Sequence, residues 1–139
     1  MEAEKRIMLR ELKPPGKVDE DKDIEWLCRS FSLFTNKDTD KSAYKVFRAL
    51  LESSLEGAPI TSTEISERLG VTRGTVLFHL QKFHRSGLIV RASSRRYVLR
   101  SSSLEDTIED IMRDTLQIFE KMKKVASDID KEFGIEKRW

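Results

Sequence analysis

Apolar residues recur every three or four positions in the first part of the chain, the spacing that gathers them on one face of an α-helix. One such segment begins at Asp23, whose side chain favours a helix start, and continues to about residue 34. Its apolar positions are Ile24, Leu27, Cys28, Phe31 and Phe34. A second segment starts after Asp40 or Ser42 and runs to about Glu56, where Gly57 favours its end. The pattern therefore predicts two amphipathic helices in this part of the chain.

The segments that follow predict a short extended piece, two shorter helices and a β-hairpin. "APIT" is long enough only for an extended piece, and "TSTEISERLG" then predicts a helix with Ser62 or Thr63 as its cap and Gly70 at its end. Thr72 is the expected cap of the next helix, "RGTVLFHLQKFHRS", which Gly87 ends. The β-prone runs "LIVRA" and "RRYVLR" are separated by two serines, the spacing of a hairpin with a polar tip.

From Ser103 the pattern predicts a single helix of about 30 residues, or roughly 45 Å at 1.5 Å per residue. Its apolar positions step by four and three over more than three heptads, which is typical of a coiled-coil seam. The seam positions are Leu104, Ile108, Ile111, Thr115, Ile118, Met122, Val125 and Ile129, and the stripe is widened by Met112, Phe119, Ala126 and Phe133. Because so long a helix overhangs a core built from residues 41–100, we expect the seam to join a second subunit, with packing on its own domain alone as the alternative.

The chain divides into three parts. Residues 1–22 are expected to form a flexible arm, because "KPPGK" interrupts any helix and "VDEDKD" is a run of charges. Residues 23–102 form one compact domain, and residues 103–139 form the long helix and its tail. The single Cys28 has no partner for a disulfide, "MEAEKRIMLREL" is too charged for a signal peptide, and no apolar run approaches the ~20 residues that cross a bilayer. These features predict a cytoplasmic protein without membrane contact.

Positive charge is concentrated in one block, although the net charge of the chain is only +2. Between Arg68 and Leu104 there are eight basic residues and no Asp or Glu. Of the 26 basic residues of the chain, 18 are therefore left elsewhere, against all 24 acidic residues. The eight are Arg68, Arg73, Lys82, Arg85, Arg91, Arg95, Arg96 and Arg100. Since ordinary solvated surfaces mix both signs, we expect a polyanion to lie against this block.

The order helix, short strand, helix, tight turn, helix, hairpin over residues 41–100 is that of a winged helix-turn-helix. Here "STEISERLGVTRGTVLFHLQKFHRSGLIVRASSRRYVLR" resembles the DNA-binding core of the ArsR-like repressors and their archaeal relatives. The matching residues are Ile65, Leu69, Gly70, Val71, Thr72, Thr75, Val76, His79, Leu80, Phe83, Gly87, Leu88 and Ile89. The resemblance implies a mainly α fold with a hairpin wing, double-stranded DNA as a partner and an archaeal type of regulator. Asn and Gln occur only three times in the chain, a bias associated with hot-growing organisms.

The helix after Thr72 carries a buried and an exposed face. On a helical wheel Val76, Leu80 and Phe83 share a narrow arc that must be buried, and the opposite face would enter a major groove. Thr72, Arg73 and Thr75 can donate to phosphate, Arg73 could read guanine, and Gln81 can pair with adenine, while wing arginines suit phosphate or the minor groove. The predicted DNA-binding residues are Thr72, Arg73, Gly74, Thr75, Leu77, Phe78, Gln81 and Lys82 on this helix and Arg91, Ser94, Arg95 and Arg96 on the wing.

Two apolar residues on this exposed face leave alternatives open. Leu77 and Phe78 could lie against thymine methyl groups, but they depart from the polar side chains usual at these positions in the family that the chain resembles. The helix could instead meet a protein or rely on the shape of DNA. A further alternative is an architectural chromatin protein that uses the same basic face without sequence preference.

The two histidines do not indicate a metal or catalytic site. His79 and His84 are five residues apart on one helix, so they point about 140° away from each other and cannot share a metal ion. We expect His79 to be packed or to contact phosphate and His84 to be exposed. The "STEISERLG" helix has no Cys pair, where metal-sensing members of the family place thiolates, and the chain shows no glycine-rich phosphate loop or catalytic triad. The sequence thus predicts a homodimeric transcription regulator with no cofactor, metal or enzymatic activity.

Overall fold

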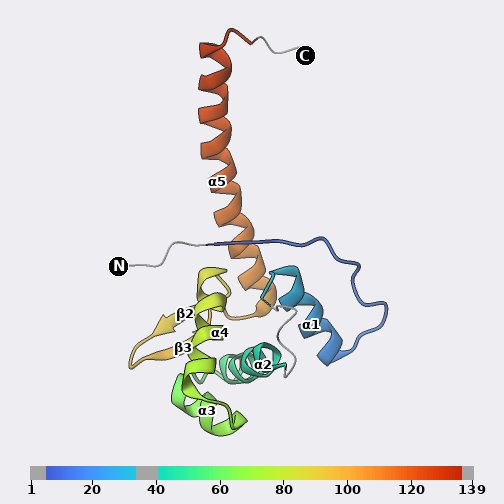
Figure 1. The fold of residues 1–139 in the computed structure, drawn as a ribbon, viewed down its shortest axis with the longest axis vertical. Coiled ribbons are helices and arrows are strands. Elements are labelled where there is room, and N and C mark those ends of the chain that lie inside the picture. Colours follow the sequence, from blue (N-terminus) through green and yellow to red (C-terminus); the bar gives the residue numbers. More distant parts are fainter. Residues whose placement is uncertain (1–5, 34–40, 136–139) are drawn as a thin grey trace.

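The computed structural model of the protein describes residues 6–33 and 41–135. Within these ranges the chain forms five helices and a three-stranded antiparallel sheet, and Figure 1 shows α5 rising from a base made by the other elements. The elements are α1 (Glu20–Ser30), α2 (Ser42–Leu55), β1 (Ile60–Thr61), α3 (Ser62–Leu69), α4 (Arg73–Arg85), β2 (Ile89–Ala92), β3 (Arg96–Leu99) and α5 (Leu104–Glu132). The predicted fold, a mainly helical winged helix-turn-helix with a preceding helix and a long C-terminal helix, is confirmed.

The core of the domain forms around α2, which packs against α3, α4 and β3. Val46, Phe47 and Leu50 of α2 are completely buried. The ring of Phe47 meets that of Phe83 from α4 edge to face, with 5.3 Å between the centroids. Burial of each large apolar side chain stabilises the fold by about 1.5–3 kcal/mol, so these contacts fix α4 against the domain.

The sheet has the strand order β1-β3-β2 and carries the wing. Ile60 lies opposite Tyr97, and Ile89 lies opposite Leu99. These four side chains are buried, whereas Arg96, which alternates with Tyr97 along β3, is exposed. The short extended piece and the hairpin predicted from the sequence are therefore present as β1 and as β2 with β3.

Helix α1 begins earlier than the sequence pattern predicts. Its cap is Asp19, whose side chain accepts a hydrogen bond from the backbone N–H of Lys22 at 3.0 Å, so the predicted start at Asp23 is wrong. Asp23 lies instead in the acidic first turn, where its charge suits the positive end of the helix dipole. The helix ends at Ser30, and Phe34 lies outside the described residues.

The caps of the next helices are fixed by hydroxyl groups. Thr61 caps α3 by accepting from the backbone N–H of Glu64 at 3.1 Å, so neither Ser62 nor Thr63 is the cap. The reason is that Thr61 ends the strand β1 with extended backbone angles, which are those of a cap residue. The predicted cap of α4, Thr72, is confirmed.

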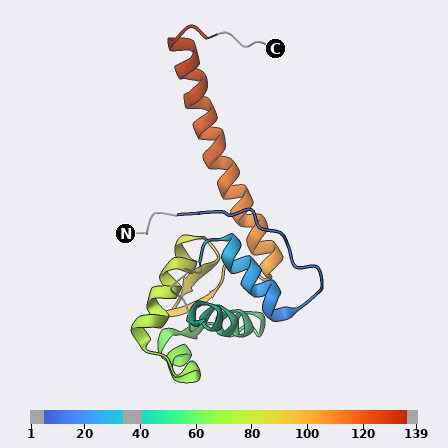
Figure 2. The ribbon, with the colours of Figure 1, turned by 45° about the vertical axis from the view of Figure 1, so that its right-hand side comes forward.

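The described part of the N-terminal arm, residues 6–18, contains no helix or strand but is bonded to the domain. The backbone N–H of Arg6 donates to the carbonyl of Arg85 at the end of α4, and that of Arg10 donates to the carbonyl of Ser30 at the end of α1. Figures 1 and 2 show the arm crossing α5 just above the domain. The arm, α1 and α5 therefore meet on one side of the molecule.

Helix α5 has 29 residues, which confirms the predicted length. Its first turns pack on the domain, since Thr107 and Ile111 are buried. The hydroxyl of Thr107 accepts from the backbone N–H of Ser101 at 3.1 Å and donates to the carbonyl of Ser103 at 2.8 Å. Beyond these turns the helix extends away from the base (Figure 2).

Candidate nucleic-acid interface

Helix α4 presents one face to the core and the other to solvent, as the wheel predicts. Val76, Leu80 and Phe83 are completely buried. On the other face, Phe78 is 55% exposed, and Gln81 is exposed as well. The predicted division of this helix into a buried arc and an accessible face is confirmed.

The start of α4 is capped by hydrogen bonds of Thr72 and is exposed to solvent. The hydroxyl of Thr72 accepts from the backbone N–H of Thr75 at 3.2 Å and also bonds the Thr75 hydroxyl at 2.8 Å. Gly70, which ends α3, has the left-handed φ of +68° that the tight turn between the two helices requires. Gly74 is exposed, and a side chain built there would meet no atom within 4 Å. This helix start can therefore approach an anion or a nucleic-acid backbone closely.

Aromatic and cationic groups share the exposed face of α4. The ammonium of Lys82 lies 4.6 Å from the centroid of the Phe78 ring, within the range of a cation–π contact. The Nε of Arg73 donates to the hydroxyl of Ser62 in α3 at 3.3 Å. Leu77 is half-buried rather than fully accessible. The ring of Phe78 is therefore partly covered by a positive charge.

A cleft of about 350 Å³ separates this face from the wing. Its walls come from α4, β2 and β3 and are formed by Gly74, Leu77, Phe78, Leu80, Gln81, His84, Arg91 and Tyr97. The guanidinium of Arg91 lies 6.0 Å from the centroid of the Tyr97 ring. The fold thus brings residues of α4 and the wing, which are separated by a turn in the sequence, to the two sides of one depression.

The tip of the wing is exposed and includes two residues with left-handed backbone angles. Ser94 and Arg95 have φ values of +59° and +58°, and both side chains are exposed. Arg96 differs from Arg95, because it bonds Glu64 of α3 at 3.3 Å and donates to the carbonyl of Pro59 at 3.2 Å. Of the ion pairs within the described ranges, none involves Arg91 or Arg95. Arg91 and Arg95 are therefore exposed charges of the wing that take part in none of these ion pairs.

Arg100 belongs to the basic block of the sequence but not to this surface. Its Nη1 bonds Asp114 of α5 at 2.7 Å, and its Nε lies 4.0 Å from Asp110. The hydrogen bond to Asp114, with the nearby charges of both carboxylates, raises the pKa of the guanidinium. The expectation that a polyanion faces the whole block is therefore wrong for Arg100, because acids of the following helix already neutralise it.

The histidines serve the packing of α4. His79 is buried, its Nε2 lies 2.8 Å from the hydroxyl of Ser42 in α2, and its ring stacks near Phe83. The prediction of a packed histidine is confirmed, whereas a phosphate contact by so buried a ring is ruled out. His84 is half-buried, so its predicted exposure is wrong. The described residues contain no group of three or more His, Cys, Asp or Glu side chains that could hold a metal ion.

The seam of α5 divides into a covered and an uncovered part. Leu104, Ile108 and Thr115 are half-buried and Ile111 is 4% exposed, so these members of the seam pack on their own domain. The later members are 46% to 57% exposed and comprise Ile118, Met122, Val125 and Ile129. A groove between α5, α1 and the arm, which the sequence did not reveal, adjoins the uncovered part.

No helix of the described ranges is both long enough and apolar enough to cross a membrane.

Comparison with known proteins supports the domain described above. Residues 39–92, which include α2, α3, α4 and β2, match a family model described as a helix-turn-helix domain. A search of curated proteins and a search of solved structures found no match. The sequence match and the order of the elements together identify residues 39–92 as a helix-turn-helix domain, the kind of domain that suggests a DNA-binding regulator.

Proposed function

We propose that this chain is a homodimeric DNA-binding transcription regulator, with α4 in the major groove and the wing on the phosphate backbone or in the minor groove. The observation that carries the proposal is the surface formed by the exposed face of α4 and by Arg91 and Arg95 across the 350 Å³ cleft. No acidic residue occurs between Arg68 and Leu104, so both sides of that cleft come from an acid-free segment. Such a surface suits the negative charge of DNA.

The residues at the start of α4 have distinct proposed roles. The hydroxyl groups of Thr72 and Thr75 and the backbone N–H groups of the first turn suit a phosphate, assisted by the helix dipole. Arg73 can read guanine, or can donate to phosphate if its bond to Ser62 is exchanged. Gly74 allows the DNA backbone to approach, since nothing lies within 4 Å of its Cβ position.

The middle of α4 and the wing supply the remaining proposed contacts. Gln81 suits adenine, and Phe78, flanked by Lys82, suits a thymine methyl beside a phosphate. Leu77 contributes to the wall of the cleft. On the wing, Arg91, Ser94 and Arg95 are available for phosphate or the minor groove, whereas Arg96 must first exchange its ion pair with Glu64.

The uncovered part of α5 supports the dimer. Its exposed apolar seam lies on the part of α5 that extends beyond the domain, and pairing of two such helices around a two-fold axis would bury it. A dimer predicts a pseudo-palindromic site whose half-sites are about 34 Å apart, one turn of DNA, or a multiple of that distance.

A salt titration of DNA binding tests the proposal. The variant Arg91→Ala with Arg95→Ala should bind duplex DNA more weakly, and its slope of log K against log salt should be smaller by about two. The control is Lys124→Ala with Lys131→Ala, which removes two charges from the far part of α5 and should leave the slope unchanged. Equal slopes for the wing variant and the unmodified chain would contradict the proposed wing contacts.

One observation favours a second candidate, a winged helix that binds a protein. The ring of Phe78 is more than half exposed on the face that would read DNA. If α4 binds a protein instead of DNA, the unmodified chain would not retard duplex DNA in a gel-shift assay at physiological salt. An architectural chromatin protein would instead bind random DNA nearly as well as its own promoter, whereas a specific regulator should prefer the promoter by ~10³ or more.

A further inference from the structure

The part of the α5 seam that a partner can reach is its upper half. Ile111 is 4% exposed and Thr115 is half-buried, so the lower half of the seam packs on its own domain. The four seam positions beyond them are 46% to 57% exposed and comprise Ile118, Met122, Val125 and Ile129. A partner of this seam therefore contacts these four positions and leaves the buried ones in place.

Large apolar side chains along one edge widen this exposed stripe. Met112, Phe119 and Phe133 each directly follow a seam position and are 64%, 59% and 77% exposed. At roughly 180 Å² for a fully exposed large side chain, these three and the four seam positions expose roughly 700 Å² per copy. That area exceeds what monomers usually expose in one patch and is close to one partner's share of a standard interface. The stripe is therefore large enough for a stable dimer.

A groove of about 700 Å³ adjoins the lower end of this stripe. Leu9 lines it from the arm, Trp26 lines it from α1, and Met112 and Phe119 line it from α5. The indole Nε1 of Trp26 donates to the carbonyl of Leu12 at 3.3 Å, which ties the arm to α1 beside the groove. The groove therefore offers an apolar surface to a side chain that reaches it along α5.

We propose that two α5 helices pair antiparallel through residues 118–133, with Ile118 opposite the partner's Ile129 and Met122 opposite the partner's Val125. The end of each α5 then lies over the groove of the other copy. The inference rests on the proposed homodimer and deepens it by assigning the direction and register of the pair and the occupant of the groove.

Burial on the domain selects this register. It pairs the four exposed seam positions with one another and uses none of the buried ones. A shift of the partner by one heptad toward the domain would place its Ile129 opposite Ile111, which is only 4% exposed, and would bring Lys121 to the partner's Lys121. A shift of one heptad away would place Ile118 opposite a position beyond Glu132, the last residue of the helix.

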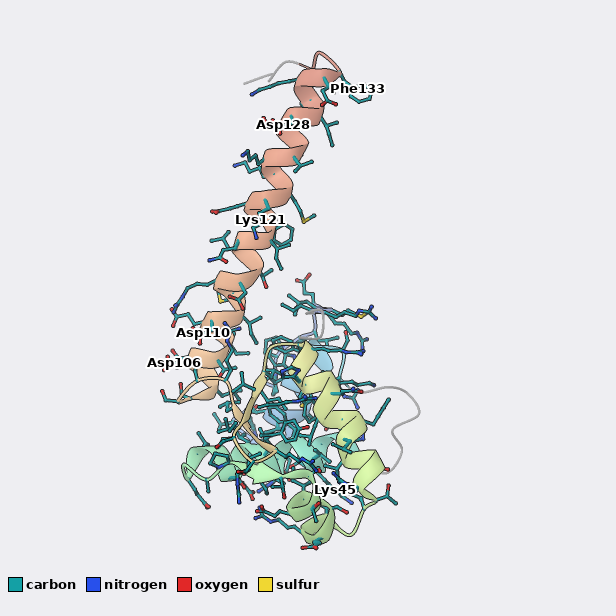
Figure 3. The ribbon with its side chains drawn as sticks, turned by 90° about the vertical axis from the view of Figure 1, so that its left-hand side faces the viewer. Lys45, Asp106, Asp110, Lys121, Asp128 and Phe133 are labelled. Atoms are coloured by element: carbon teal, nitrogen blue, oxygen red, sulfur yellow. The ribbon has the colours of Figure 1, made fainter. Side chains whose placement is uncertain are left out.

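The charges of α5 agree with the register that burial selects. Lys121 and Asp128 are exposed, and both lie directly before a seam position on the part of α5 that extends beyond the domain (Figure 3). Neither takes part in an ion pair among the described residues. In an antiparallel pair this edge faces the same edge of the partner, so Lys121 meets the partner's Asp128 twice. Asp114, lower on the same edge, stays bonded to Arg100 of its own domain.

The apolar edge of the stripe favours antiparallel over parallel helices. The antiparallel register places Phe119 against the partner's Ala126 and Met112 against the partner's Phe133. In a parallel pair, the charged edge of one helix would face this apolar edge, and Asp128 would lie beside the partner's Phe133. That arrangement is poor, because burial of an unpaired charge is costly.

The same register brings an aromatic ring to the groove. Phe133 ends α5 and is 77% exposed, so its own copy does not bury it. Its predicted neighbour in the partner, Met112, is one of the residues that line the groove beside Trp26. The pair therefore covers both the exposed seam and the two grooves, one at each end of the paired segment.

Disulfide cross-linking tests the direction and the register. The double variant Ile118→Cys with Ile129→Cys should form a covalent dimer on oxidation, because a disulfide requires two Cα atoms within about 7 Å. The two positions are about 16 Å apart within one helix, so they cannot bridge internally. Each single variant should cross-link poorly, since it would face its own copy only in a parallel pair. Thr115→Cys with Val125→Cys, which meet only after a shift of one heptad, should also cross-link poorly. The unmodified chain, whose Cys28 is 1% exposed, is the control.

The outcomes separate this inference from the proposed function. Efficient cross-linking of a single variant would overturn the antiparallel direction, and cross-linking of Thr115→Cys with Val125→Cys in place of the first pair would overturn the register. Both outcomes leave the dimeric regulator standing. A chain that sediments as a monomer at all concentrations would overturn both the homodimer and this inference, while the salt titration would still measure its DNA binding independently.

A charge exchange tests the ion pairs directly. Lys121→Glu should raise the dimer dissociation constant about tenfold at low salt, because it replaces two attractions by two repulsions. Adding Asp128→Lys to this variant should restore the dissociation constant to within about threefold, since the opposite charges face each other again. The matched control is Lys124→Glu, which makes the same charge change away from the stripe and should have little effect. Failure of the exchange to restore the dimer would contradict the pairing of Lys121 with the partner's Asp128.

Truncation of one ring tests the occupant of the groove. Phe133→Ala should raise the dimer dissociation constant about tenfold, because two rings lose their contacts with the partner. The matched control is Leu55→Ala, which removes a side chain of similar exposure, 59%, at the end of α2. Equal dissociation constants for these two variants would show that Phe133 does not cover the groove of a second copy.

Discussion

The substitution Arg100→Ala should loosen α5 from the domain without weakening the proposed binding to DNA. The Nη1 of Arg100 bonds Asp114 at 2.7 Å, and its Nε lies 4.0 Å from Asp110. The guanidinium also packs beside Gly87, where Nη1 lies 3.7 Å from the position of a Cβ. Loss of this side chain would remove the hydrogen bond and ion pair that Arg100 makes with Asp114.

The magnitude follows from the partial burial of the pair. The side chains of Arg100 and Asp114 are 24% and 25% exposed, between a fully exposed and a buried ion pair. Hydrogen bonds to charged groups contribute about 1.5–3 kcal/mol, whereas exposed pairs contribute less than about 1 kcal/mol. We therefore expect the free energy of unfolding to fall by about 1–2 kcal/mol and the Tm to fall by roughly 3–8 °C.

Two measurements check this prediction. Thermal and urea unfolding followed by circular dichroism, at one fixed protein concentration, give the loss of stability. A double-mutant cycle with Asp114→Ala separates the pair from lost packing. The control is Arg95→Ala, at the exposed tip of the wing, which should leave stability within about 0.5 kcal/mol but reduce the salt slope of DNA binding by about one. If Arg100→Ala instead reduces that slope and leaves stability unchanged, Arg100 contacts DNA and the reasoning fails.

Three further substitutions and one chemical probe test other parts of the structure. Gly87→Ala should lower the free energy of unfolding by about 1–3 kcal/mol, because φ is +87° and the new Cβ would lie 3.3 Å from the side chain of Ile111. The matched Gly74→Ala should keep full stability in the same urea titration but weaken DNA binding in a gel shift; normal binding would exclude a close approach there. Burial raises the pKa of the Cys28 thiol to about 12, so it should react with a thiol reagent at pH 8 only in denaturant. Phe78→Ala should leave unfolding unchanged while reducing affinity for thymine-containing sites, and unchanged affinity would favour a protein partner.

Much of the candidate interface could be predicted because its determinants are local. The period of Val76, Leu80 and Phe83 fixes the buried arc of α4, and Thr72 can cap the helix using only a neighbour three residues away. The misplaced starts of α1 and α3 show the limit of such signals. Several hydroxyl or carboxylate groups stand near each start, and the backbone angles of the preceding residues decide which one caps.

The sequence by itself determined the order of the elements, the accessible face of α4, the length of α5 and the concentration of positive charge, because each depends on spacing along the chain. Only the tertiary structure decided which charges remain available. Packing brings Asp114 to Arg100 and Glu64 to Arg96, while Arg91 and Arg95, which are exposed, take part in none of the ion pairs among the described residues. It also decided how much of the α5 seam its own domain covers. Ion pairs and buried area depend on distances of a few ångströms between segments far apart in sequence, and these exist only once the helices have packed.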